Sequence, residues 1–315
     1  MENLNFVKEP KISIIITYFN MSKFIGDCIK SILIQTYQNF EIIIVNDGSK
    51  NEDRKALNNF QNNQIKIVDL DSNKGQLYAL YKGLEHAEGE FICMVDADDI
   101  LLPNYLKTLL LAHLKNNYAL ISSNRGDINE NGEILSLGVN NSKINYSELE
   151  NLYKTKEYFE VQKVKAPFGL WSWNPSTSAM WRKNAIEILQ YFPDKEYWHT
   201  GADKVIFSLL HLIGGSANID TVCFLYRIHT DNNFNSSKFS GNKKYISEKT
   251  VNKLIDWNIK LRLDTIKMFI KNKKQIVEKY NKINYLKMLF KVVFCINMQI
   301  CAKVIKTLAH KVINL

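Results

Sequence analysis

Residues 91–99 read Phe-Ile-Cys-Met-Val-Asp-Ala-Asp-Asp, and the rest of the chain is arranged around this stretch. Its first five residues are apolar with no polar face, a pattern typical of a strand buried on both sides of a parallel sheet. Asp96, Asp98 and Asp99 follow. In open α/β sheets ligands bind beyond the carboxyl ends of the strands, which is where these carboxylates fall. The stretch therefore predicts a central strand that ends at a ligand site.

The acidic triplet has two interpretations. Neighbouring carboxylates repel one another, so the cluster favours a hard cation such as Mg²⁺ or Mn²⁺. Asp96 and Asp98 are two positions apart and could both reach one metal-bound diphosphate from a non-helical turn. The alternative is a solvated acidic loop before the helix that begins at Pro103. Taken alone, the triplet supports both interpretations equally.

Strand and helix patterns alternate through the first 122 residues. Apolar runs predict strands, and helical spacing predicts the segments between them; the strands are 11–17, 41–45, 65–68, 91–95 and 118–122, and the helices are 24–33, 52–60, 76–87 and 103–115. Short connections between alternating elements indicate an α/β fold with a doubly wound, mostly parallel, Rossmann-like sheet.

The pattern changes after residue 122. Asn131-Gly132 is a hairpin signal, and residues 150–165 have a polar, helical pattern. Residues 167–181 are rich in aromatic side chains and are expected to form a binding wall and not a regular element. Helices at 183–191 and 203–213 and a strand at 222–228 follow. Residues 231–242 have the composition of a boundary loop, and 243–315 predict two or three basic helices.

Size and charge limit the class of protein. The 315 residues are 46% hydrophobic, enough for a large core of one or two domains. The net charge of +9 is uneven, because residues 238–315 hold 18 basic and 4 acidic side chains while the preceding residues hold 23 and 28. A mildly acidic body with a basic tail argues against nucleic-acid binding and indicates a tail that meets an anionic surface.

Cysteine usage and hydropathy predict a cytoplasmic location. The five cysteines form no CxxC pair, and three lie in apolar runs, as expected for buried thiols in a reducing compartment. The first apolar run, 12–16, is too short for a signal peptide. The longest uncharged stretch near the C-terminus, 292–302, is shorter than the ~20 residues that span a bilayer.

Two common nucleotide-binding motifs are absent. The turn after the first strand, Thr17-Tyr18-Phe19-Asn20, has no glycine, so GxGxxG is missing, and no GxxxxGK[ST] occurs. A nucleotide would therefore be held by an aromatic platform and carboxylates, with a metal ion for the phosphates.

Four ordered motifs resemble glycosyltransferase family 2, whose members have the GT-A fold. They are 17–20, 45–49 (Val-Asn-Asp-Gly-Ser), 73–75 (Asn-Lys-Gly) and 95–99 (Val-Asp-Ala-Asp-Asp), and the resemblance covers about residues 10–230. It implies a GT-A catalytic domain at 1–235, with a nucleotide-binding half at about 10–122 and an acceptor half at about 123–235. Residues 236–315 would be a basic α-helical extension.

The resemblance also implies roles for single residues. The nucleotide would contact five of them, with the uracil stacked on the Phe19 ring and the ribose near Asp96: Thr17, Phe19, Asp47, Lys74 and Asp96. The metal ion, Mn²⁺ or Mg²⁺, would be held by Asp98 and by His229 of the Tyr226-Arg227-Ile228-His229 motif. Asp203 would be the catalytic base, and Trp171 and Trp173 would face the acceptor.

Each of these residues also has a structural interpretation. Phe19 and the two tryptophans fit core packing, Asp47 fits a helix cap, Asp203 fits a helix N-terminal acid, and a lone histidine such as His229 is often structural.

The chain departs from the family pattern at three points. Leu80 stands where the family has arginine, whose charge Lys74 or Lys82 would have to supply, and Ala202 replaces the glutamate beside the base. The QxxRW signature of processive synthases is absent, which favours addition of a single sugar.

The implied function is an inverting, non-processive, metal-dependent transfer of a hexosyl or related sugar. The donor would be a UDP-sugar and the acceptor a saccharide or lipid-linked saccharide, in the synthesis of a bacterial surface polysaccharide such as capsule or O-antigen. Two other classes remain open: a catalytically silent nucleotide-sugar-binding protein and a structural scaffold that uses the basic tail.

The tail predicts an amphipathic basic helix. Its apolar side holds Leu289, Phe290, Val293, Ile300, Val304 and Leu308, and its other side holds Lys291, Gln299, Lys303, Lys306 and His310. Such a helix suits the anionic inner face of a cell membrane. The alternative is a helix packed on the catalytic domain or on a second copy of the chain in a homo-oligomer.

Overall fold

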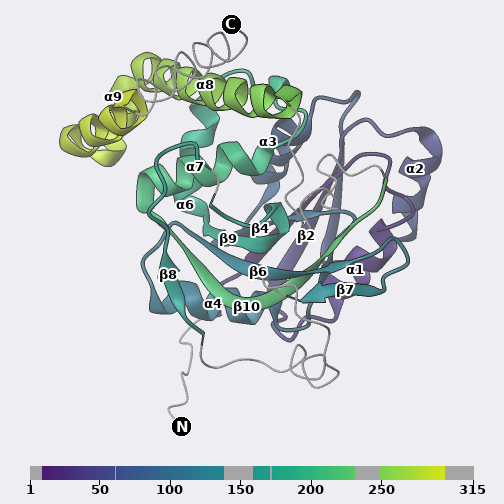
Figure 1. Ribbon diagram of the computed structural model, residues 1–315. Coiled ribbons are helices and arrows are strands. Elements are labelled where there is room, and N and C mark those ends of the chain that lie inside the picture. The colour runs from purple at the N-terminus through teal and green to yellow at the C-terminus, as the bar shows by residue number, and fades with distance from the viewer. Residues whose placement is uncertain (1–8, 61, 138–158, 171, 231–247, 295–315) are drawn as a thin grey trace, which may run out of the picture.

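The computed structural model describes residues 9–60, 62–137, 159–170, 172–230 and 248–294, with side chains from residue 256 onward in the last range. These residues form one ten-stranded mixed sheet of order β3-β2-β1-β4-β9-β6-β10-β5, with β7 paired to β6 and β8 to β10. Helices cover both faces (Figure 1).

The N-terminal half confirms the predicted alternation. β1 (Ile12–Tyr18), β2 (Phe40–Asn46), β3 (Ile65–Asp69) and β4 (Phe91–Asp96) are mutually parallel. They are joined by α1 (Ile25–Leu33), by α2 (Asn51–Ala56) with the short 3₁₀ turn η1 (Leu57–Asn59), and by α3 (Gln76–His86).

Continuous apolar runs suit these strands because both faces of the sheet are covered. Ile15, Ile43 and Met94 belong to one buried cluster and Ile14 and Cys93 to another, so alternate residues of a strand serve opposite faces. This explains why strands β1, β2 and β4 lack a polar alternation.

The next elements extend the sheet beyond β4. β5 (Ile100–Leu101) is followed by α4 (Tyr105–Lys115), which begins two residues after Pro103, with Asn104 as its N-cap. β6 (Leu120–Ile128) and β7 (Ile134–Leu137) form the predicted hairpin, with Gly132 at φ +87° in its turn.

The predicted absence of regular structure at 167–181 is wrong at its end. The 3₁₀ turn η2 (Ser176–Ser178) leads into β9 (Ala179–Arg182), which lies antiparallel between β4 and β6. Four residues carry too little periodicity to predict a strand, and burial of Met180 and Trp181 between helices and sheet holds it there.

The predicted helix at 150–165 is also wrong for its last residues. β8 (Val161–Lys163) is a short strand that pairs with β10 (Ser216–Arg227). Residues 138–158 lie outside the described part of the chain.

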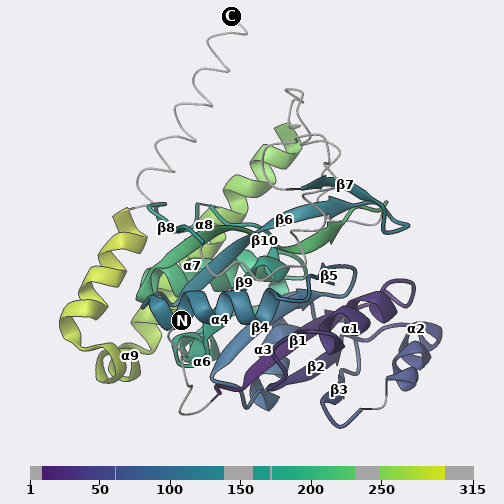
Figure 2. The same ribbon diagram turned by 90° about the horizontal axis from the view of Figure 1, so that it is seen from below.

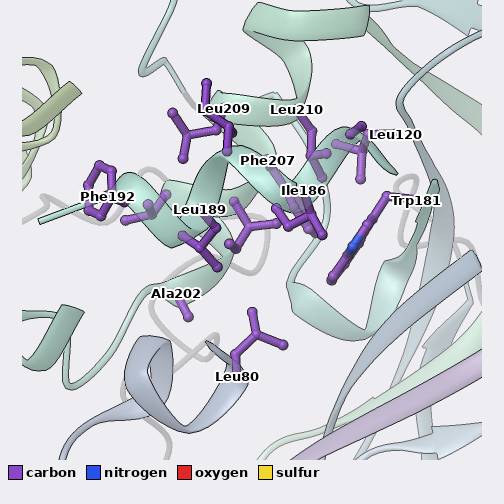
Figure 3. Close-up of a cluster of buried hydrophobic side chains, with 14 of the residues drawn as sticks. Leu80, Leu120, Trp181, Ile186, Leu189, Phe192, Ala202, Phe207, Leu209 and Leu210 are labelled. Atoms are coloured by element: carbon purple, nitrogen blue, oxygen red, sulfur yellow. The ribbon is translucent and has the colours of Figure 1, made fainter. Parts of the chain in front are cut away.

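The remaining helices pack on one face of the sheet. They are α6 (Lys183–Ile186) with η3 (Glu187–Tyr191), η4 (Lys195–Tyr197) and α7 (Ala202–Gly214). Figure 3 shows Ile186 of α6, Phe207 of α7 and Trp181 of β9 close together, and the Phe207 and Trp181 rings are 6.2 Å apart. Ala202, the first residue of α7, belongs to the same buried cluster.

The C-terminal helices join the same core. α8 (Glu248–Lys271), α9 (Lys273–Tyr280) and a helical segment at 282–294 lie at the end of the molecule opposite β3 and α2 (Figure 2). Leu261, Phe269, Ile276 and Tyr285 are buried in one cluster with residues of α7. Within the described residues, the C-terminal helices therefore pack on the body of the protein. In the described ranges, no helix combines the length and hydropathy needed to span a bilayer.

Candidate active site

The carboxyl ends of β2, β1 and β4 lie side by side. Thr17 pairs in register with Val45 on one side and with Asp96 on the other. Phe19 follows β1 and is 42% exposed, while the preceding Tyr18 is fully buried and donates its hydroxyl to the Asp53 carbonyl at 2.7 Å. An exposed ring beside a strand end suits stacking of a planar base and does not fit the core-packing alternative.

Asp47 is buried and organises the loop that precedes α3. Its Oδ1 accepts from the Lys74 backbone N–H at 2.7 Å, and its Oδ2 accepts from the Gly75 N–H at 2.9 Å. Burial raises its pKa, against the lowering effect of these two N–H groups. The carboxylate thus makes no cap for α2. Each carboxylate oxygen keeps a further lone pair, which can accept a hydrogen bond from a nucleobase N–H.

Asp96 is held between two side chains that the sequence did not indicate. Its Oδ1 accepts from Gln76 Nε2 at 3.1 Å and its Oδ2 accepts from the Ser176 hydroxyl. Burial, reinforced by the nearby negative charges of Asp98 and then Asp203, raises the pKa of Asp96 to about 7. The negative charge of Asp96 is therefore energetically costly at this position, and a bound cation would lower that cost.

Asp98 and His229 form a direct pair. His229 Nε2 lies 2.8 Å from Asp98 Oδ2, and both residues are buried. Arg227 helps to hold this pair in place. Its Nε donates to the Asp98 carbonyl at 2.8 Å, and its backbone N–H donates to Asp99 Oδ1 at 3.1 Å. The fold thereby joins residues 131 positions apart.

Asp203 lies in the first turn of α7 and is partly buried. Its Oδ1 accepts from the Lys204 backbone N–H at 2.8 Å. Burial raises its pKa to about 6, although Lys204 and nearby backbone N–H groups lower it. A carboxylate with a raised pKa beside other acids has the electrostatic character of a general base.

Gln76 connects Asp96 to the first residue of α7. Besides donating to Asp96, it accepts at Oε1 from the Ala202 backbone N–H at 3.3 Å. The first N–H groups of α3 also donate across to the segment before α7, from Gln76 to the His199 carbonyl and from Leu77 to the Trp198 carbonyl, both at 3.2 Å. The start of α3 is therefore fastened to the start of α7.

The remaining predicted residues lie around this centre. Lys74 Nζ is 3.4 Å from Glu196, and Lys82 pairs with Glu85 on the outer face of α3. Leu80, at the position of the family arginine, is fully buried in the core. Trp173 is also buried, and its Nε1 donates to Ser216 Oγ at 3.0 Å, which is the core-packing alternative. Trp171 lies outside the described residues.

The donor atoms present fit Mn²⁺ or Mg²⁺ in part. Asp98 offers carboxylate oxygen and His229 imidazole nitrogen, a combination that suits Mn²⁺ in particular. Among the described residues, no group of three or more His, Cys, Asp or Glu side chains is arranged to hold a metal ion. Asp98 and His229 would therefore be the protein's ligands, and the diphosphate of a bound nucleotide and water would complete the coordination.

Sequence comparison identifies the family. Residues 13–167 match the family described as "Glycosyl transferase family 2". These residues form a glycosyltransferase family 2 domain. The match includes Thr17, Asp47, Asp96 and Asp98 and ends before Asp203 and His229, which the fold brings to the same edge of the sheet.

Two relatives are named as glycosyltransferases. The chain is 37% identical over 100 residues to "Glycosyltransferase GlyG" of Streptococcus pneumoniae serotype 4, covering 31% of this chain and 33% of that protein. It is 34% identical over 138 residues to an Escherichia coli protein named "UDP-Glc:alpha-D-GlcNAc-diphosphoundecaprenol beta-1,3-glucosyltransferase WfgD", covering 44% and 54%. The chain thus spans from a third to about half the length of these relatives.

The fold is GT-A. The structure of S. aureus TarS residues 1–349 in complex with UDP-GlcNAc matches with a TM-score of 0.54 and 18% identity, covering 81% of this chain and 67% of that one. A mannosyltransferase from Pyrobaculum calidifontis, solved with GDP-Man and Mn²⁺, matches with a TM-score of 0.52 and 14% identity, covering 96% and 76%.

Proposed function

We propose that the protein is an inverting, non-processive glycosyltransferase that moves a hexosyl or related sugar from a UDP-sugar to a saccharide or lipid-linked saccharide. The observation that carries the proposal is the convergence of Asp96, the Asp98–His229 pair and Asp203 at one edge of the sheet. Gln76 links Asp96 to Ala202, the residue before Asp203. The named activity of WfgD and the UDP-sugar bound to TarS support the donor and acceptor classes.

In this mechanism Asp203 removes the proton from the acceptor hydroxyl as that oxygen attacks the anomeric carbon in line. A positioned base contributes typically ~10²–10⁴ in rate. Phe19 and Asp47 hold the uracil end of the donor and Asp96 the ribose. When bound by Asp98 and His229, Mn²⁺ or Mg²⁺ supplies positive charge for the departing diphosphate. No covalent enzyme intermediate is required.

The biological setting is part of the proposal. The relatives named above and a Staphylococcus epidermidis teichoic acid polymerase, 38% identical over 116 residues covering 36% of this chain and 16% of that protein, support the synthesis of a bacterial surface polysaccharide. The buried free thiols Cys28, Cys93 and Cys223 support a reducing, cytoplasmic location. A location at the inner face of the membrane fits a lipid-linked acceptor.

The first test is UDP release from a panel of UDP-sugars with Mn²⁺ or Mg²⁺, before and after EDTA. Release from one donor that requires the metal and is lost in Asp98→Ala and Asp203→Asn would support the enzyme and name its sugar. Lys82→Gln, on the outer face of α3, is the matched control and should keep the wild-type rate.

Binding without turnover on any donor, with lipid-linked saccharides also supplied, would favour the silent sugar-nucleotide-binding alternative. Ala202 and Leu80, which depart from the family pattern, make this the competing class. Absence of UDP binding in all conditions would overturn the site assignment.

A further inference from the structure

The helical segment 282–294 has two apolar faces. Tyr285, Met288 and Val292 are buried against the body of the protein. A second set of apolar side chains is between 40% and 69% exposed: Ile283, Leu286, Phe290, Val293 and Phe294. At 3.6 residues per turn, this second set forms a stripe on the side of the helix opposite the buried face.

The exposed stripe, defined here as residues 283, 286, 290, 293 and 294, is continuous. The Phe290 and Phe294 rings stack with centroids 5.9 Å apart. Single exposed apolar residues are common on protein surfaces, but a row of five along one helix marks an interaction surface.

Lysines flank the stripe on both sides. Helical geometry places Lys282 along one edge and Lys287 and Lys291 along the other, and all three are exposed. The sequence has no Asp or Glu after Glu278, so the local charge is uncompensated within this segment. An apolar row between two basic edges matches the boundary between acyl chains and anionic headgroups.

We propose that the stripe docks the protein on the surface of a bilayer that contains anionic lipid, with the three lysines among the headgroups. The stripe would be the surface that gives the membrane location proposed above. The experiment that tests this docking does not depend on glycosyltransferase turnover. A second copy of the chain is a poorer occupant, because a symmetric contact would bring the lysine edges of both copies together.

The structure revises the predicted membrane face. Leu289, expected in the apolar set, is partly buried against the core, whereas Phe290 and Val293 keep their expected exposure. Ile283 and Leu286 are new members. Lys291 borders the stripe and does not oppose it. Ile300, Val304 and Leu308 lie outside the described residues.

The test is flotation of the full chain with vesicles of phosphatidylcholine, with or without phosphatidylglycerol. Wild type should bind the anionic vesicles. The triple variant Ile283→Ser, Leu286→Ser, Phe290→Ser should lose on the order of tenfold or more in partitioning, because each exposed apolar side chain loses its burial in lipid. Each of Lys282→Glu, Lys287→Glu and Lys291→Glu should lose about fivefold or more.

The control is Ile34→Ser together with Leu135→Ser, which removes exposed apolar residues (64% and 51%) from other parts of the surface and should leave binding unchanged. An unchanged melting temperature and an unchanged circular dichroism spectrum would confirm that the triple variant is folded. Wild-type partitioning of the triple variant would overturn the proposal. So would equal binding to both vesicle types, or a dimer in solution that the triple variant converts to monomer without any vesicle binding.

Discussion

Asp203, the proposed catalytic base, lowers the stability of the folded protein at neutral pH. Its pKa rises from an ordinary value of 3.8 to about 6 on folding, mainly through burial. The folded state therefore holds the proton more tightly than the unfolded state, and stability declines as pH rises from about 4 to about 6. Above that range the folded protein retains the full penalty of a buried negative charge.

Replacing Asp203 by Asn should separate the two effects. We expect turnover to fall by ~10² or more, since the base is lost. At neutral pH the free energy of unfolding should rise by about 1 to 2 kcal/mol, a value reduced from the full pKa shift because the side chain is partly exposed. Urea unfolding measures the change in stability, and UDP release measures the change in turnover. A variant that is both inactive and less stable would contradict this account.

The wild-type rate should depend on pH through the same group. Because the base acts only when deprotonated, kcat should fall tenfold per pH unit below a pH of about 6 and reach a plateau above it. A pH profile of UDP release at saturating donor measures this. A rate that is flat down to pH 4 would exclude Asp203 as the base.

Gln76 is the residue through which Asp96 and α7 are positioned. Gln76→Met keeps the length of the side chain but removes both hydrogen bonds, so we expect kcat to drop about tenfold or more, with UDP affinity much less affected. Glu85→Gln, on the exposed side of the same helix, is the control. Equal effects on kcat and on UDP affinity would indicate a binding role instead.

At the scale of elements, the junction between α3 and the segment before α7 determines the geometry of the site. Gly75, at φ +90°, makes this junction possible, because a Cβ there would lie 2.7 Å from the His199 Cα. The Gly75 N–H also donates to Asp47, so this glycine contacts both Asp47 and the segment before α7.

Gly75→Ala tests the junction against a matched glycine. Gly132 has a similar φ of +87°, but a Cβ added there would meet no atom nearer than the Arg227 guanidinium, at 3.8 Å. Gly132→Ala should cost about 1 to 2 kcal/mol from backbone strain alone. Gly75→Ala should cost more than this and also reduce turnover, because α3 must move away from residues 198–199. Equal losses of stability, measured by urea unfolding, would show that the close packing does not matter.

At the scale of the whole molecule, the C-terminal helices complete the core. Phe269 and Ile270 are adjacent on α8, yet Phe269 is fully buried and Ile270 is 66% exposed. Phe269→Ala should therefore destabilise the protein by about 3 to 5 kcal/mol, whereas Ile270→Ala should change stability by less than about 0.5 kcal/mol.

The variants Phe269→Ala and Ile270→Ala also test the predicted domain boundary between residues 235 and 236. If the helical extension folded separately from the catalytic domain, Phe269→Ala would produce a second unfolding transition and leave UDP binding intact. A single cooperative transition that shifts as a whole, followed by both fluorescence and UDP binding, is the expected result because α8 shares its core with α7.

The sequence by itself determined the parallel half of the sheet and the acids at its edge. Continuous apolar runs at 12–16, 41–45 and 91–95 can be buried only between two layers, and parallel pairing then brings their carboxyl ends together with Asp47, Asp96 and Asp98. The order of the motifs also indicated His229 and Asp203, far along the chain.

Only the tertiary structure decided the rest. β9 is too short to predict and exists because the sheet and α7 enclose it. Gln76 and Ser176 became site residues because two distant helix starts and a strand end meet, which no local pattern encodes. Helical periodicity predicted an amphipathic helix from Leu289 onward. Only packing against the body determined which apolar side chains of residues 282–294 face the core and which remain exposed.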